Sequence, residues 1–376
     1  MQTHQLIRKG FETGLLSLCC LGFSLAAFAC STTENSGSGS SGAGGGGLGG
    51  TTAGGAGGGT AGTGGSNSAA GGEVISGGSG MAGGAAGTNQ AGGGTAGSGG
   101  SAAVVGDRSP EGTCTRWKAD TADLDEGTWS GSVESCEPGD ISANGRENAL
   151  RMYNLIRWLA DLPPVVTEEE RNLQAQACAL LMTANPKLSH MPPMDWQCWT
   201  QLGYDGANTS NISSGPGVSS VLLYMIDDGN LTTFGHRRII LGNGLGPIGL
   251  GSAGDDGKSC MQNIGGEGDA GKAWMAWPPP GPFPIQAYGN QWASLDETGW
   301  SIQSEDIDLS DASVAITAGG QELQVQVEQL TGNYGGARAI RIAPSGWEAE
   351  VGTTYAVSVS GTSTPIAYEV QVIDCE

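Results

Sequence analysis

The stretch ALRMYNLIRWLADLPPV, residues 149–165, decides the fold because it carries the clearest helical pattern in the chain. From Met152 onward its apolar residues recur at i, i+3, i+4 and i+7, which places them on one face of a helix. The sequence Leu162-Pro163-Pro164 ends this helix, since proline cannot continue the main-chain hydrogen bonding. The apolar face of this helix is therefore predicted to pack in a core.

Two more helices are predicted downstream. Thr167-Glu-Glu-Glu170 has the sequence of a capping box and precedes an apolar stripe from Leu173 to Ala184. A third helix is expected to begin near Pro216 and to end at Gly229. Short apolar runs between turn-forming residues are predicted strands: 238–241, 248–251 and 273–277. Three helices and a small sheet indicate a mixed domain, which we place at residues 141–284.

After the proline-rich residues 277–284 the apolar period changes to two, as is typical of strands. The alternation is clear in three runs: 323–327, 355–359 and 368–372. Gly319-Gly320 is a predicted hairpin turn. We therefore predict an α+β protein in which a small immunoglobulin-like β-sandwich, residues 285–376, follows the mixed domain.

Residues 1–29 are a predicted secretory signal peptide. Arg8 and Lys9 precede an apolar run from Gly14 to Ala29, which is too short for a comfortable membrane span. An ordinary A-x-A cleavage site ends at Ala29. The same residues also resemble a bacterial lipoprotein signal, in which Cys30 becomes the lipidated first residue.

Residues 30–106 are predicted to be a lipidated cysteine followed by a tether. Of the 68 glycines, 32 lie between residues 31 and 106, so this stretch cannot bury enough apolar surface to order itself. Ser31 after Cys30 resembles the outer-membrane sorting pattern of Gram-negative lipoproteins. We expect a secreted lipoprotein of the bacterial outer membrane or cell surface, which contacts the membrane only through its N-terminal lipid.

The cysteine count is consistent with lipidation. Of nine cysteines, Cys19 and Cys20 leave with the signal peptide, and lipidation uses Cys30. Six remain: Cys114, Cys136, Cys178, Cys198, Cys260 and Cys375. An even number predicts three disulfides in an oxidising compartment, whereas cleavage without lipidation leaves one free thiol.

Residues 107–140 are predicted to be an irregular, acidic loop region closed by Cys114 and Cys136. A calcium loop is the alternative there, but the acidic residues do not follow the spacing of an EF-hand. The whole chain has a net charge of −22, and nearly all of it lies after residue 106. Such an acidic protein is a poor ligand for nucleic acid or for an anionic membrane face, so both partners are excluded.

The candidate chemistry lies on two histidines. His190 and His236 are the only histidines beyond the signal peptide, and imidazole is a common zinc ligand and acid/base group, although either ring can be purely structural. Nucleophile motifs are lacking: Gly-x-Ser-x-Gly occurs only in the tether, and there is no His-Glu-x-x-His. Arg237 and Arg238 are expected to neutralise nearby carboxylates, with clamping of an anion as the alternative. N-x-[ST] sequons at Asn208, Asn211 and Asn230 are expected to mark surface loops.

Five motifs in order resemble the CAP superfamily (cysteine-rich secretory proteins, antigen 5 and pathogenesis-related proteins) in a divergent bacterial form: ALRMYNLIRWLADLPPV, LQAQACALLMTANPKLSH, ANTSNI, VLLYMID and GHRRIIL. The resemblance implies an α-β-α sandwich over residues 141–284, with a cleft where two histidines and two glutamates converge. His190 and His236 match the two histidines. Ser210 stands where the family has one glutamate, and Asp227 stands in place of the other.

The resemblance also implies disulfides and functions. It implies a Cys178–Cys198 pair, and we expect Cys114–Cys136 and Cys260–Cys375 beside it. The first functional hypothesis is a non-enzymatic binding module that holds an apolar or small ligand, such as a lipid, in the His190/His236 cleft. The second is a peptidase-like hydrolase in which a divalent metal such as zinc is held by both histidines and Asp227. The third is a structural module that binds envelope polymer.

Overall fold

The structure is a computed structural model, and it describes residues 106–376. The predictions for the signal peptide, Cys30 and the tether up to residue 105 lie outside the described residues. The described residues form an α+β fold and belong to one compact unit. None of their helices is long and apolar enough to cross a membrane.

Three of the helices were predicted, and the structure adds several. The bounds are α1 Pro110–Thr121, α2 Ala143–Leu159, α3 Glu169–Thr183, α4 Gln201–Asn208, α5 Gly217–Ile226, α6 Gly235–Ile240, α7 Leu295–Thr298 and the 3₁₀ helix η1 Ile285–Ala287. The predicted strand 238–241 is wrong, because these residues continue α6 and the turn after it. The predicted capping box is also wrong, because the N-cap of α3 is Glu168 and its side chain makes no capping bond.

The expectation of an irregular loop over residues 107–140 is wrong for residues 110–121, which form helix α1. Pro110 stands in its first turn, and Ser109 Oγ accepts a hydrogen bond from the Gly112 N–H at 3.1 Å. Only Thr113 and Trp117 of this helix are buried. Because so few of its residues face the core, the apolar periodicity that identifies a helix is nearly absent.

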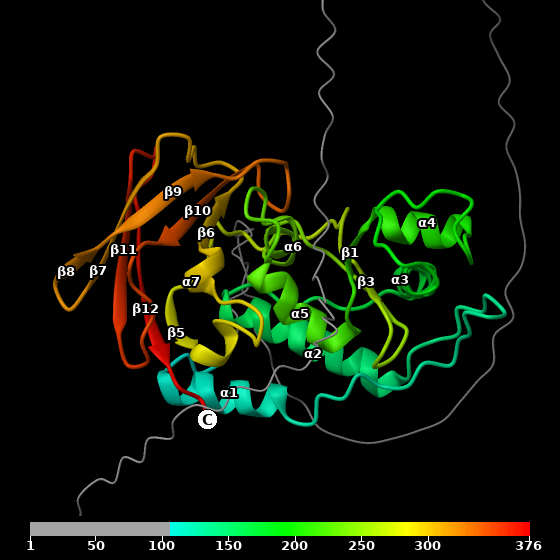
Figure 1. Cartoon of the computed structure of the whole chain (residues 1–376). Helices are drawn as coiled ribbons and strands as arrows, with labels where there is room; N and C mark the ends of the chain where they lie inside the picture. Colours follow the sequence, from blue (N-terminus) through cyan, green and yellow to red (C-terminus); the bar gives the residue numbers. More distant parts are fainter. Residues whose placement is uncertain (1–105) are drawn as a thin grey trace, which may run out of the picture. The chain divides into compact units, whose positions relative to one another are not determined.

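A three-stranded antiparallel sheet lies between two pairs of helices (Figure 1). Its strands β1 (Ser210–Ser213), β2 (Gly249–Ser252) and β3 (Ser259–Gln262) run in the order β1-β3-β2. Helices α3 and α4 contact this sheet, and so do α2 and α5. Gly251 allows α3 to approach closely, since a Cβ atom there would lie 2.3 Å from the Gln176 main-chain nitrogen.

The remaining strands form two sheets that share one core with α2 and α5. Their bounds are β4 Met275–Trp277, β5 Gly281–Pro284, β6 Trp300–Ser304, β7 Ser313–Ala318, β8 Gln321–Leu323, β9 Val325–Gln329, β10 Arg338–Pro344, β11 Thr354–Ser360 and β12 Ile366–Ile373. One sheet has the order β4-β6-β10-β9, and the other has the order β5-β12-β11-β7-β8. The predicted hairpin at Gly319-Gly320 joins β7 to β8.

The two sheets begin earlier than residue 285, where the sequence places the start of the β-sandwich. Strand β4 pairs with β6, and β5 pairs in parallel with β12. Neither shows the period of two: all three residues of β4 are buried, and β5 is the sequence Gly-Pro-Phe-Pro. Alternation is visible only where one face of a strand meets solvent.

Three disulfides join the six described cysteines, but the predicted pairs are wrong. The bonds are Cys114–Cys375, Cys136–Cys198 and Cys178–Cys260. Cys178 lies on the buried face of α3, opposite β3, and so it pairs with Cys260 rather than with the loop that follows His190. Three disulfides indicate an oxidising compartment.

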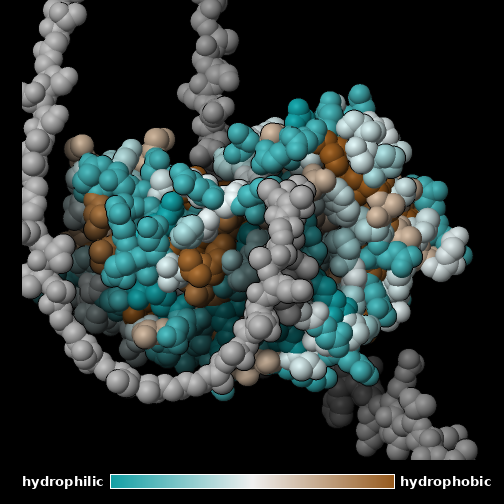
Figure 2. Space-filling view, turned by 180° about the vertical axis from the view of Figure 1, so that it is seen from behind, coloured by the Kyte–Doolittle hydropathy of each residue, from teal (hydrophilic) through white to brown (hydrophobic). Residues whose placement is uncertain are grey.

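The surface agrees with the acidic composition. On the face shown in Figure 2, most of the coloured surface is hydrophilic, and hydrophobic residues appear in separate patches. Exposed large apolar side chains include Met191, Met194 and Trp292, each at least 70% exposed. The first two lie one and four residues after His190 in the sequence.

Candidate functional site

His236 is held by a buried carboxylate at the end of α5. Asp227 is the C-cap residue of this helix and has a left-handed backbone, with φ of 55°. His236 Nδ1 lies 2.7 Å from Asp227 Oδ1. The second carboxylate oxygen, Oδ2, accepts the Arg237 N–H at 3.2 Å. Because the Asp227 side chain is fully buried, this pair fixes the orientation of the imidazole.

Two asparagines, which the sequence analysis identified only as parts of sequons, also form hydrogen bonds that hold His236 in place. Asn230 Nδ2 donates to Asp227 Oδ1 at 2.9 Å, and Asn211 Nδ2 donates to the His236 carbonyl oxygen at 3.2 Å. Asn211 is buried on β1, so the expectation of a surface loop is wrong there. The ring of Tyr224 lies 5.0 Å from the His236 ring, centroid to centroid. Nothing in the spacing of these residues revealed their role, since their contacts cross between elements.

His190 lies in the segment after α3 and contacts the end of α4. Its Nδ1 lies 3.0 Å from the Ala207 carbonyl oxygen, and Asn208 Nδ2 donates to the His190 carbonyl oxygen at 3.5 Å. Burial lowers the pKa of His190; the Ala207 carbonyl opposes this effect, and the charge on His236 adds to it. His190 is therefore neutral at neutral pH.

Both imidazoles are held through the same nitrogen, Nδ1. The nearest partner of each Nδ1 is an acceptor, a carbonyl oxygen at 3.0 Å for His190 and a carboxylate oxygen at 2.7 Å for His236. Asn230 Nδ2 also lies 3.1 Å from His236 Nδ1. An acceptor requires Nδ1 to carry the hydrogen, so Nε2 of the neutral His190 ring keeps its lone pair. Each ring therefore has a fixed orientation, and the neutral His190 ring offers one hydrogen-bond acceptor or nitrogen ligand.

Ser210, the fourth predicted site residue, is fully buried on β1. Strand alternation places it on the same side as Ile212, which packs with Ala207 and Cys178. Its hydroxyl has no hydrogen-bond partner among residues 106–376. A buried hydroxyl without a partner costs about 1–3 kcal/mol relative to a satisfied one. Ser210 is therefore a polar group with unused hydrogen-bonding capacity beside the segment that holds His190.

The described residues do not fit the predicted catalytic zinc site. A catalytic zinc needs three protein ligands and one open position. Among residues 106–376 no group of three or more His, Cys, Asp or Glu side chains is arranged to hold a metal ion. Asp227 uses both oxygens in hydrogen bonds to His236 and Arg237, so it orients a histidine rather than standing beside it as a third ligand.

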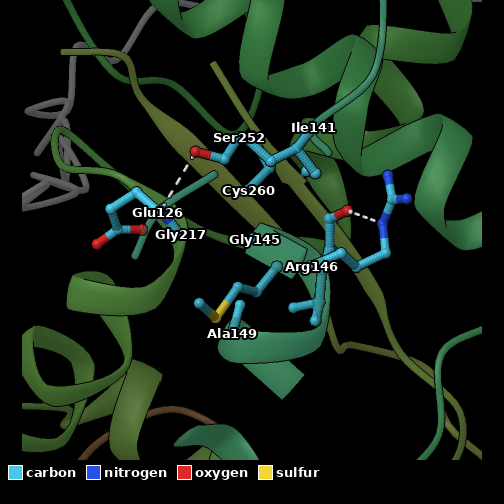
Figure 3. Close-up of a pocket in the computed structure, with 11 residues that line it drawn as sticks. Glu126, Ile141, Gly145, Arg146, Ala149, Gly217, Ser252 and Cys260 are labelled. Carbon is cyan, nitrogen blue, oxygen red and sulfur yellow. Dashed lines mark hydrogen bonds between the residues drawn. The ribbon is translucent and has the colours of Figure 1, made fainter. Parts of the chain in front are cut away.

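The cavity drawn in Figure 3 lies away from the histidines, between α2, β2 and the start of α5. Two hydrogen bonds of 3.2 Å join residues that line it. One runs from the Gly217 N–H to Ser252 Oγ, and the other runs from Arg146 Nε to the Leu250 carbonyl oxygen. Its volume is about 10 Å³, which is room for about one water molecule. It is too small to be the ligand site.

We compared the chain with family models, curated proteins and solved structures, and none of the three comparisons gave a match. The resemblance to CAP proteins therefore rests on the sequence motifs alone. The function is argued below from the geometry around His190 and His236.

Proposed function

We propose that this protein is a secreted, membrane-tethered binding protein of the CAP type that holds a small ligand with an apolar part at His190 and His236. The observation that carries this proposal is the pair of imidazoles, each held in a fixed orientation through its Nδ1. The layer order of helices around the three-stranded sheet agrees with the α-β-α sandwich that the CAP resemblance implies. The two later sheets agree with an immunoglobulin-like sandwich.

The surroundings of the histidines favour a particular ligand chemistry. The acceptor nitrogen of the neutral His190 ring favours a ligand with a hydroxyl or amine donor. Met191 and Met194, exposed at 70% and 78%, follow His190 and offer flexible apolar surface. A ligand with a polar donor group and an apolar body matches both features.

The hydrolase alternative is less well supported. All six described cysteines are in disulfides, so none of them is a nucleophile. The two histidines also lack a third ligand for a metal among the described residues. The structural module that binds envelope polymer remains the alternative for the two later sheets, where Trp292 is 70% exposed.

Extraction of bound molecules from the purified full chain tests the proposal. The wild type, His190→Gln, His236→Gln and the control Trp292→Ala are purified in the same detergent, and organic extracts are compared by mass spectrometry. We expect one amphiphilic species in the wild type and the control, reduced at least about tenfold in both histidine variants, which corresponds to about 1.4 kcal/mol. Identical extracts from all four proteins contradict the proposal, and loss only in Trp292→Ala favours the envelope-binding module.

A further inference from the structure

Two arginines follow His236 directly, and both are buried although the protein is acidic. We expected Arg237 and Arg238 to neutralise carboxylates. Their guanidinium N–H groups instead donate to main-chain carbonyl and hydroxyl oxygens, several of them in or beside the β4-β6-β10-β9 sheet. The segment that contains His236 is therefore hydrogen-bonded to residues that are distant from it in sequence.

Arg237 joins the end of α5 to the start of β6. Its Nε and Nη2 donate to the carbonyl oxygens of Met225 and Ile226, at 2.6 and 2.8 Å. Its Nη1 donates to the Gly299 carbonyl oxygen at 2.9 Å and lies 3.3 Å from Ser301 Oγ. One fully buried guanidinium thus spans the distance from the helical region to the β4-β6-β10-β9 sheet.

The acceptors on α5 explain why an arginine stands here. The last carbonyls of a helix lack partners within the helix and carry a negative partial charge, so a cation stabilises them. Asp227 is the next residue after Ile226, and it accepts the main-chain N–H of Arg237. The side chain of Arg237 therefore fixes the helix end, and its main chain fixes the carboxylate that orients His236.

Arg238 makes the second connection, to the loop between β9 and β10. Its Nη1 donates to the Thr331 carbonyl oxygen at 2.8 Å, and its Nη2 donates to the Gly336 carbonyl oxygen at 2.7 Å. Its guanidinium lies 5.7 Å from the centre of the Tyr334 ring. Gln303 Nε2, on β6, donates to the Arg238 carbonyl oxygen at 3.0 Å. The first turn of α6 is thus held by the sheet from both its side chain and its main chain.

The charge on Arg237 persists at neutral pH. Burial lowers its pKa to about 9, and the negative charge of Asp227 opposes that lowering. A buried cation is tolerated only where hydrogen bonds and an opposite charge compensate for the lost water. Removing the guanidinium leaves the carbonyls at the end of α5 without a donor.

We propose that Arg237 is a positioning residue of the two-histidine site, through which the β4-β6-β10-β9 sheet sets the orientation of Asp227 and His236. The β4-β6-β10-β9 sheet then supports this site and is not solely part of a module that binds envelope polymer. This inference concerns the geometry of His236 and holds whatever ligand the site binds.

Histidine-selective ¹⁵N NMR of the full chain at pH 7.5 tests the inference, with thermal melting alongside. Arg237→Met is compared with Arg237→Lys and with the control Arg341→Met. Arg341 is also buried, and it donates to the Thr298 and Glu297 carbonyl oxygens rather than to the carbonyls at the end of α5. His236→Gln assigns the signals.

We expect Arg237→Met to lose the low-field Nδ1–H signal of His236 that reports its hydrogen bond to Asp227. Arg237→Lys should restore part of that signal, because it keeps a donor at the helix end. Arg341→Met should lower the melting temperature and leave the signal in place. A wild-type spectrum in folded Arg237→Met, or equal loss in Arg341→Met, overturns the inference.

If Arg237→Met does not fold, Ser301→Ala takes its place, since it removes one hydrogen-bond acceptor of Arg237 on the sheet side. We then expect the His236 signals to shift while those of His190 do not. His236 signals that coincide with those of the wild type in this variant overturn the inference equally.

Discussion

At the scale of single residues, His190 has a pH-dependent effect on stability whose sign follows from its surroundings. Burial lowers the pKa of His190 in the folded protein below its usual 6.5. Above that value the ring is neutral in both the folded and unfolded states. As the pH falls from about 6.5 toward the folded pKa, the unfolded chain binds the proton first, so the free energy of unfolding decreases.

We therefore expect His190→Gln, which can still donate to the Ala207 carbonyl oxygen, to depend less on pH than the wild type. Urea unfolding at pH 7.5 and pH 5.5 measures this difference, and comparing the two proteins cancels the contribution of the other titrating groups. An equal loss of stability in both proteins on acidification would show that His190 is solvated.

Part of this site could be predicted from residue types. Histidine is so scarce in the sequence that His190 and His236 stood out, and Asp227 was found through the CAP resemblance. The roles of Asn211 and Arg237 could not be predicted, because their partners are main-chain carbonyl oxygens. Every residue has such an oxygen, so the sequence contains no pattern that reveals these contacts.

At the scale of elements, helix α5 is fixed at both ends by groups distant in sequence. At its start, Glu126 Oε2 accepts the Val218 N–H at 2.6 Å, and Oε1 accepts the Ser219 N–H at 2.8 Å. A carboxylate at a helix N-terminus satisfies free N–H groups and interacts favourably with the helix dipole. At its end, the Arg237 guanidinium satisfies two carbonyls.

The capping role of Glu126 gives a prediction. Glu126→Ala should destabilise the protein by roughly 1 kcal/mol, as the loss of a helix cap does. Glu134→Ala, in the same acidic region but exposed, is the control and should change little. Chemical denaturation of both variants measures the difference, and equal stabilities mean that water replaces the carboxylate without loss.

The Cys178–Cys260 bond gives a second prediction at this scale. It joins α3 to β3, so the double variant Cys178→Ala/Cys260→Ala should lose about 2–5 kcal/mol of stability. Peptide mapping under non-reducing conditions should find this pair and also Cys136–Cys198. A peptide joining Cys178 to Cys198 contradicts the placement of α3 against the sheet.

The pairing itself was beyond prediction from residue types. Six cysteines allow 15 connectivities, and spacing does not choose among them. Long amphipathic helices such as α2 were predictable because one face is buried along their whole length. Helix α1, with two buried residues, and strand β4, buried throughout, lack the contrast between faces that a periodic pattern requires.

At the scale of the whole molecule, the proposed lipid anchor at Cys30 is tested in cells. Cys30 lies outside the described residues, and its lipidation follows from the signal sequence and the cysteine count. Cys30→Ala should move the protein out of the membrane fraction and abolish labelling with a radioactive acyl chain. Cys20→Ala, within the signal peptide, is the control. Unchanged membrane association of Cys30→Ala contradicts the lipoprotein proposal.

The bond between Cys114 and Cys375 joins two residues separated by 261 positions, in α1 and next to the last residue. Mechanically, it makes the folded part inextensible. A pull between residues 106 and 376 can straighten only the few residues outside the bridge, roughly 30–35 Å of chain at about 3.5 Å per residue. Without the bond, the same pull could draw out on the order of 900 Å as the sheets peel apart. A force applied between residues 106 and 376 is therefore carried by the Cys114–Cys375 disulfide and not by the residues around His190 and His236.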